Sequence, residues 1–121
     1  MDLADHKDTE RAIGEIRERL EGGVLHALVN NAAISPKGPN GARLGSIDTD
    51  VDIWSHVFRV NFFAPVMLAR GLIEELKAVK GSVVNVTSIA GSRVHPFAGA
   101  AYATSIAPGE IDTSILSPGT E

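Results

Sequence analysis

Two hydroxyl-bearing side chains in the second half of the chain are the strongest candidates for chemistry. Ser88 ends the run SVVNVTS, and Tyr102 lies further on in the stretch AAYATS. A serine hydroxyl and a phenol can both donate hydrogen bonds to one carbonyl oxygen while a proton moves to or from that oxygen. The pair therefore indicates acid–base chemistry at a carbonyl or alcohol group.

A catalytic phenol needs a neighbouring positive charge. A phenol in water ionises near about pH 10, so catalysis near neutral pH requires a cation that lowers this pKa. One helical turn after Tyr102 stands Ile106, whose side chain supplies no charge, and Lys80, the last lysine, precedes the segment with Ser88. We therefore expect the chain to lose most of the ~10²–10⁴-fold benefit of tuned acid–base catalysis.

The segments that must hold these residues alternate between helical and strand-like patterns. Apolar residues at helical spacing predict a helix over Asp8–Leu20, capped by Asp8 and ended by Gly22-Gly23. The apolar run VLHALVNNAA, residues 24–33, is typical of a parallel strand covered on both faces. His26 within it is interpreted as structural, because no second metal ligand has a recognisable spacing.

A second helix and a second strand follow a long loop. The prolines and glycines of Ser35–Asp50 predict a surface loop, and loops of this length in compact domains tend to be functional. A helical pattern runs from Asp52 to about Val79, and Pro65 should kink or break it. The β-branched segment Ser82–Ser88 predicts a buried strand. The order helix, strand, helix, strand predicts an α/β fold with a parallel sheet.

The composition fits one small domain over residues 1–121. Hydrophobic residues make up 44% and charged residues 21%, and the net charge of −4 offers no basic surface for nucleic acid. The absence of cysteine excludes disulfides and thiolate chemistry. No apolar stretch is long enough to span a membrane, and the first five residues do not resemble a signal peptide, so we expect a cytoplasmic protein with no membrane partner.

Polar residues follow both predicted strands. Asn30 and Asn31 come after the first strand, and Thr87 and Ser88 come after the second. In open α/β sheets, ligands bind beyond the carboxyl ends of the strands. We therefore expect a small-molecule site at that edge of the sheet.

Five motifs in this order resemble the short-chain dehydrogenase/reductase family of NAD(P)-dependent oxidoreductases. They are LVNNAA, VNFFAP with Asn61, VVNVTSIAG, AYATS and APGEIDTS, and the resemblance covers nearly the whole chain from Asp2 to Thr113. The resemblance implies a Rossmann-like, doubly wound parallel sheet. It also implies hydride transfer between nicotinamide C4 and a carbonyl or alcohol carbon, in which NAD or NADP carries out the redox chemistry.

The resemblance further implies a role for each matching residue. Tyr102 would be the acid/base, Ser88 would orient the substrate carbonyl, and Asn61 would hold a water of the proton relay. Ala33 stands where the family usually has glycine. The residues implied at the cofactor are Asp2 and Leu3 near the adenine, Asn30 fixing the central strand with Asn31 and Ala32 near the ribose, and Pro108, Gly109, Ile111 and Thr113 near the nicotinamide carboxamide.

The chain departs from the family pattern in three places. The family has Tyr-x-x-x-Lys, and this chain has Ile106 at the lysine position. Only nineteen residues separate Ser88 from Pro108, whereas a whole βαβ unit needs about thirty, so a helix and a strand cannot both fit. No glycine-rich turn joins a strand to a helix, although a dinucleotide fold needs one to hold the pyrophosphate.

These departures lead to two alternative interpretations. The first is a family member that is truncated at its N-terminus and internally deleted after Ser105, with a partial sheet, open edges and impaired oxidoreductase activity. The second is a non-catalytic fragment or binding module that uses the helix over 52–79 to form a homo-oligomer. The substrate and the choice between NAD and NADP are not readable, and His95 in the following loop is interpreted as an exposed residue rather than a catalytic base.

Overall fold

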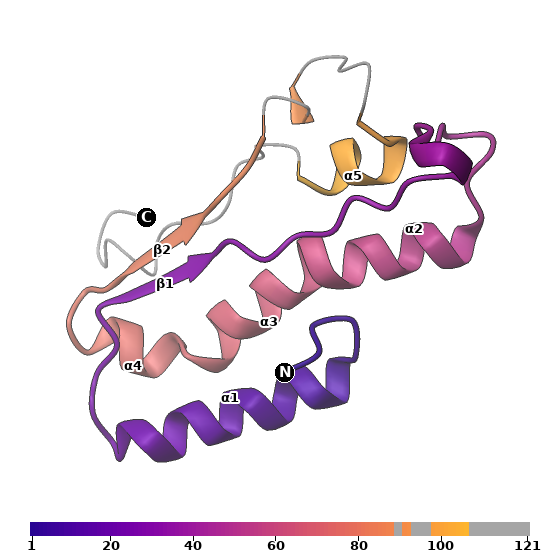
Figure 1. Cartoon of the computed structure of the whole chain (residues 1–121). Helices are drawn as coiled ribbons and strands as arrows, with labels where there is room; N and C mark the ends of the chain where they lie inside the picture. Colours follow the sequence, from indigo (N-terminus) through magenta and orange to yellow (C-terminus); the bar gives the residue numbers. More distant parts are fainter. Residues whose placement is uncertain (89–90, 93–97, 107–121) are drawn as a thin grey trace.

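The computed structural model describes residues 1–88, 91–92 and 98–106 (Figure 1). The predictions on Pro108, Gly109, Ile111, Thr113 and His95 therefore lie outside the described residues. The elements follow in the order helix, strand, broken helix, strand and short helix. This order and the parallel sheet confirm the predicted α/β class.

The first helix, α1, spans His6–Leu20 and starts earlier than predicted. Its cap is Asp5, whose side chain accepts hydrogen bonds from the backbone N–H groups of Lys7 and Asp8, so the expected cap at Asp8 is wrong. Asp8 instead lies in the first turn, where its carboxylate faces the positive end of the helix dipole. The helix ends as Glu21 adopts a left-handed conformation with φ of 49°.

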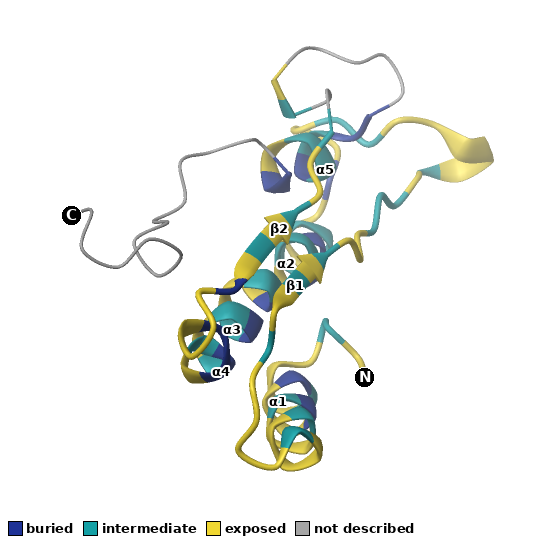
Figure 2. Cartoon of the chain, turned by 90° about the vertical axis from the view of Figure 1, so that its left-hand side faces the viewer, coloured by how far each residue is buried: buried dark blue, intermediate teal, exposed yellow. Residues whose placement is uncertain are grey.

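The sheet consists of two short parallel strands, β1 (Ala27–Asn30) and β2 (Ser82–Asn85). Ala27 pairs with Ser82 and Asn30 with Asn85. Figures 1 and 2 show α1, α3 and α4 on the same side of these strands. The expectation of strands covered on both faces is therefore wrong for the described residues. Side chains alternate between half-buried and exposed because only one face meets helices, and Val29 on the other face is 58% exposed.

The long helical segment over 52–79 is broken at two points. It forms α2 (Val51–Phe58), a π-helical turn (Arg59–Phe63), α3 (Ala64–Gly71) and α4 (Ile73–Lys77). Pro65 has no N–H to donate to the carbonyl of Asn61 and its ring would clash with that carbonyl in a regular α-helix. The wider π turn directly before Pro65 accommodates the missing bond, which confirms the predicted break and defines its type.

The buried residues of this segment also favour the breaks. Val60, Ala64, Leu68, Leu72 and Leu76 are buried at intervals of four residues. An α-helix has 3.6 residues per turn, so in one straight helix this stripe would rotate by about 40° at each step. The π turn and the interruption at Leu72 allow all five side chains to face the interior.

The helices pack closely at two points. A Cβ atom added at Gly71 of α3 would lie 2.6 Å from Cγ2 of Ile13, so the absence of a side chain allows α1 to approach α3. Arg17 of α1 pairs with Glu75 of α4, with 3.0 Å between Nε and Oε2. The Glu75 side chain is nearly buried, so this ion pair compensates a carboxylate that has left water.

The last described helix, α5, spans Ala100–Ser105 and packs against α2. The loop after β1 contains a single 3₁₀ turn over Pro39–Gly41, and its Leu44 carbonyl accepts a hydrogen bond from the Ala100 N–H at 2.9 Å. The loop therefore supports the beginning of α5.

Candidate functional site

The candidate site lies at the carboxyl ends of the two strands. In both views α5, which carries Tyr102, lies beyond these ends (Figures 1 and 2). At the last paired position, Nδ2 of Asn30 donates to Oδ1 of Asn85 at 2.8 Å. This bond joins the two strands at their carboxyl ends.

Asn61 is positioned by the π turn and joins three segments. Its Oδ1 accepts from the Ile34 N–H at 2.8 Å, and its Nδ2 donates to the Ile34 carbonyl at 2.9 Å. The same Nδ2 group donates to Oγ of Ser105 at 3.0 Å. The Asn61 side chain thus holds the loop after β1 and the end of α5 together.

Tyr102 is half-buried in apolar surroundings. It packs against Ala98 and Ile106, and Ile106 is only 7% exposed. Within the part of the chain that the structure describes, no lysine or arginine forms a hydrogen bond with the phenol. Ile106 caps the end of α5, and its N–H donates to the Tyr102 carbonyl at 3.2 Å. The position that carries lysine in the resembled family is therefore occupied by a buried hydrocarbon side chain.

The other predicted residues fall into two groups. Ser88 is half-buried beyond the end of β2, and Asn31 and Ala32 are exposed after β1. Asp2 and half-buried Leu3 precede α1 near the chain end marked N, which lies apart from α5 (Figure 1). The hydrogen bonds of Asn61 link the segment after β1 to α5, and the Asp2 region forms a separate cluster.

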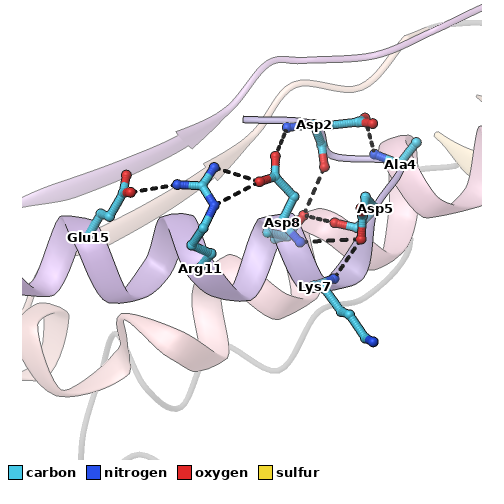
Figure 3. A network of polar contacts seen from close by, with 8 residues as sticks. Asp2, Ala4, Asp5, Lys7, Asp8, Arg11 and Glu15 are labelled. Atoms are coloured by element: carbon cyan, nitrogen blue, oxygen red, sulfur yellow. Dashed lines mark hydrogen bonds and ion pairs between the residues drawn. The ribbon is translucent and has the colours of Figure 1, made fainter.

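Figure 3 shows this N-terminal cluster. The Asp2 N–H donates to Oδ2 of Asp8 at 2.5 Å, and Arg11 bonds both Asp8 and Glu15. The backbone hydrogen bond from Asp2, followed by the one from Arg11, lowers the pKa of Asp8 below its ordinary value of 3.8. The hydrogen bond to Asp8 raises the pKa of Arg11 above its ordinary value. The Asp2 carboxylate itself accepts from the Ala4 N–H, so it is part of the turn that begins α1.

Sequence reasoning missed three residues of the candidate site. Asn85, Ile34 and Ser105 each form a hydrogen bond to a predicted site residue. Asn85 could have been found, because a polar residue inside the apolar run SVVNVTS requires a partner when a strand is half-buried. Ile34 bonds Asn61 through its backbone, and Ser105 does so through a hydroxyl group like that of any serine. Neither residue type indicates such a contact in a sequence.

The described residues do not fit the diphosphate of a dinucleotide. A helix N-terminus can hold a phosphate through its free N–H groups. The N-terminus of α1 is occupied by the carboxylates of Asp5 and Asp8, and α2 begins between Asp50 and Asp52. These charges would repel a phosphate.

The parallel pairing of β1 and β2 and the helices between them define the class as an α/β fold of Rossmann type. A family model described as short chain dehydrogenase matches residues 1–117. The chain therefore belongs to the short-chain dehydrogenase family.

Curated relatives support this assignment. The Protein FixR of Bradyrhizobium diazoefficiens is 52% identical over 145 aligned positions, which cover all of this chain and 52% of the relative. The alignment exceeds the 121 residues here by 24, so the relative contains residues inside the matched region that this chain lacks. This difference agrees with the expected internal deletion. Dehydrogenase/reductase SDR family member 7B of Xenopus tropicalis is 30% identical over 98% of this chain and 40% of its own length.

Solved structures show the same fold. An oxidoreductase of Brucella ovis in complex with a partially ordered NAD has a TM-score of 0.86 and 66% identity over 88% of this chain and 49% of its own. A second structure of a Brucella ovis short-chain oxidoreductase also has a TM-score of 0.86, with 57% identity over 97% of this chain and 67% of its own. The chain spans about half or less of the length of the two curated relatives named above.

Two further properties bear on the kind of site. Among the residues with described placement, no helix combines the length and the apolar character that a membrane span requires. In the same part of the chain, no three His, Cys, Asp or Glu side chains gather as they would around a metal ion.

Proposed function

We propose that this chain carries the substrate-side part of a short-chain dehydrogenase site and that its hydride transfer is impaired. In this proposal Ser88 orients a carbonyl or alcohol oxygen, and Tyr102 exchanges a proton with that oxygen. NAD or NADP is the cofactor and would supply the redox chemistry when bound. The observation that carries the proposal is the placement of Tyr102 beyond the strand ends with buried Ile106 as its neighbour.

Two physical features support the impairment. In the described part of the chain no lysine or arginine forms a hydrogen bond with the phenol, and the position one helical turn after Tyr102 carries the apolar Ile106. Carboxylates occupy the helix N-termini that could otherwise hold the diphosphate. We therefore expect weak cofactor binding together with slow or absent turnover.

A fluorescence titration tests this proposal. NADH and NADPH are added to the purified chain, and the Brucella ovis relative solved with NAD is titrated in parallel as a positive control. We expect no saturable change for this chain at micromolar cofactor and a clear change for the relative. Micromolar affinity of this chain for either cofactor would overturn the proposed impairment.

The long helix supports a second candidate function, a binding module that associates with another copy. Trp54, Phe58, Phe62 and Phe63 form a row of ring contacts along α2 and the π turn, with centroids 5.2 to 6.3 Å apart. Phe62 and Phe63 remain 46% and 45% exposed. Exposed aromatic rings that are already held by neighbours bind partners at a low cost in conformational entropy.

Mass measurement by size exclusion with light scattering separates the two candidates. If the aromatic row is an interface, the chain forms a dimer that Phe62→Ser disrupts. Ile47→Ser is the matched control, because Ile47 is 96% exposed but lies in the loop before α2. A monomer at all concentrations, or equal effects of both substitutions, would exclude the row as an interface.

A further inference from the structure

We propose that Ser105 is a positioning residue that fixes the orientation of Tyr102, and that it does so through Asn61. This inference rests on the function proposed above, in which Tyr102 exchanges the proton. The family resemblance assigned no role to Ser105. The hydrogen bonds around it connect the phenol-bearing helix to the loop that follows β1.

The Ser105 hydroxyl is fully engaged. Ser105 is 5% exposed, and its Oγ donates to the Tyr102 carbonyl at 2.9 Å and accepts from Nδ2 of Asn61 at 3.0 Å. A hydroxyl has one proton to donate, so the bond to Tyr102 directs its lone pairs towards Asn61. The backbone of Tyr102 and the side chain of Asn61 are thereby held at fixed places around one buried atom.

Asn61 is itself fixed by the backbone of Ile34. The Ile34 N–H requires an acceptor and the Ile34 carbonyl requires a donor, so the pair defines which end of the amide carries oxygen. Ile34 follows the exposed residues 31–33, and Asn30 at their other end is held by Asn85. The strand-end segment and α5 are therefore tied to the same amide.

This connection matters because α5 has little stability of its own. A helix of six residues does not persist in water without tertiary contacts. The contacts of Tyr102 with Ala98 and Ile106 are apolar and less directional than hydrogen bonds. The Ser105 bonds therefore fix the backbone from which the phenol extends. An error of about 1 Å in the position of a catalytic group can cost about 10²-fold in rate.

The chain offers an optical test that does not depend on activity. It contains one tyrosine and one tryptophan. Tyr102 lies on α5 and Trp54 on α2, and these helices pack together. Energy transfer from Tyr102 to Trp54 and the near-ultraviolet circular dichroism of tyrosine therefore report the position of the phenol.

We expect Ser105→Ala to reduce both signals while the far-ultraviolet spectrum stays unchanged. Thr104→Ala is the matched control, because the neighbouring Thr104 hydroxyl is exposed and bonds only the Ala100 carbonyl within α5, at 2.8 Å. Asn61→Asp should reproduce the effect of Ser105→Ala, since a carboxylate accepts from Ile34 but cannot donate to Ser105. Ser105→Thr, which keeps a hydroxyl, should restore the signals.

Three outcomes would overturn the inference. They are unchanged signals in Ser105→Ala, an equal loss in Thr104→Ala, and a loss accompanied by a lower helix content, which would assign Ser105 to folding alone. The cofactor titration tests the proposed function independently of these optical measurements. A failure of that function therefore leaves the optical result interpretable.

Discussion

At the scale of single residues, the carboxylate of Asp8 makes the stability of the folded chain depend on pH. Hydrogen bonds from the Asp2 N–H and from Arg11 favour its ionised form in the folded chain, so its pKa is lower than the ordinary 3.8. A group with a depressed pKa stabilises the fold above its unfolded pKa, and this contribution disappears as the pH falls through the folded value. We expect Asp8→Asn to be less stable than the parent chain at neutral pH and equal to it well below pH 3.8. Urea unfolding at a series of pH values measures the difference.

Glu18→Gln serves as the control for this prediction. It removes the same charge from the same helix, and the Glu18 side chain has no hydrogen bond or ion pair in the described part of the chain. A stability difference for Asp8→Asn that stays constant with pH would show that the hydrogen bonds in Figure 3 do not hold the carboxylate ionised in solution.

At the scale of elements, the contact between α1 and α3 depends on Gly71. A Cβ atom there would lie 2.6 Å and 2.9 Å from Cγ2 and Cδ1 of Ile13, so Gly71→Ala must displace Ile13 or the helix that carries it. Overpacking of this kind costs about 1–3 kcal/mol. We expect Gly71→Ala to lower the free energy of unfolding by that amount in urea titrations.

Gly14 provides the matched comparison for Gly71. No atom lies within 4 Å of a Cβ added at Gly14, in the middle of α1, so Gly14→Ala should stabilise the chain by about 0.5–1 kcal/mol through helix propensity. Combining Gly71→Ala with Ile13→Ala should recover part of the loss, because the crowding atoms are removed. A neutral Gly71→Ala variant would mean that the two helices are further apart in solution.

At the scale of the whole molecule, none of the described helices covers the second face of the sheet. Val84 of β2 is 46% exposed on this face, whereas its neighbour Val83 is half-buried on the side of the helices. Threonine keeps the β-branched shape of valine and adds a hydroxyl. We expect Val83→Thr to lower the unfolding free energy by about 1 kcal/mol or more and Val84→Thr to change it by less than about 0.5 kcal/mol.

Val84→Thr should also reduce self-association measured by light scattering, because an exposed apolar strand next to an open sheet edge is prone to pair with other chains. Equal unfolding free energies for the two variants would indicate that the open face is covered in solution.

The sequence alone determined the class of the fold and the identity of the chemical groups. Periodicity in α1 and the β-branched run of β2 reflect local burial, and the motifs around Asn61, Ser88 and Tyr102 led to the family that the comparisons show. Ile106 in place of a cation was visible without any structure. These features are local, so residue type and spacing are sufficient to reveal them.

Only the tertiary structure decided which faces are covered and which groups meet. The apolar runs of β1 and β2 predicted buried strands. A strand face is buried only where another segment of the chain packs against it, and the strand sequence does not say whether one does. The π turn before Pro65 places the Asn61 amide between Ile34 and Ser105, residues far apart in the chain. Such contacts arise from the packing of distant segments, which no spacing within a single segment encodes.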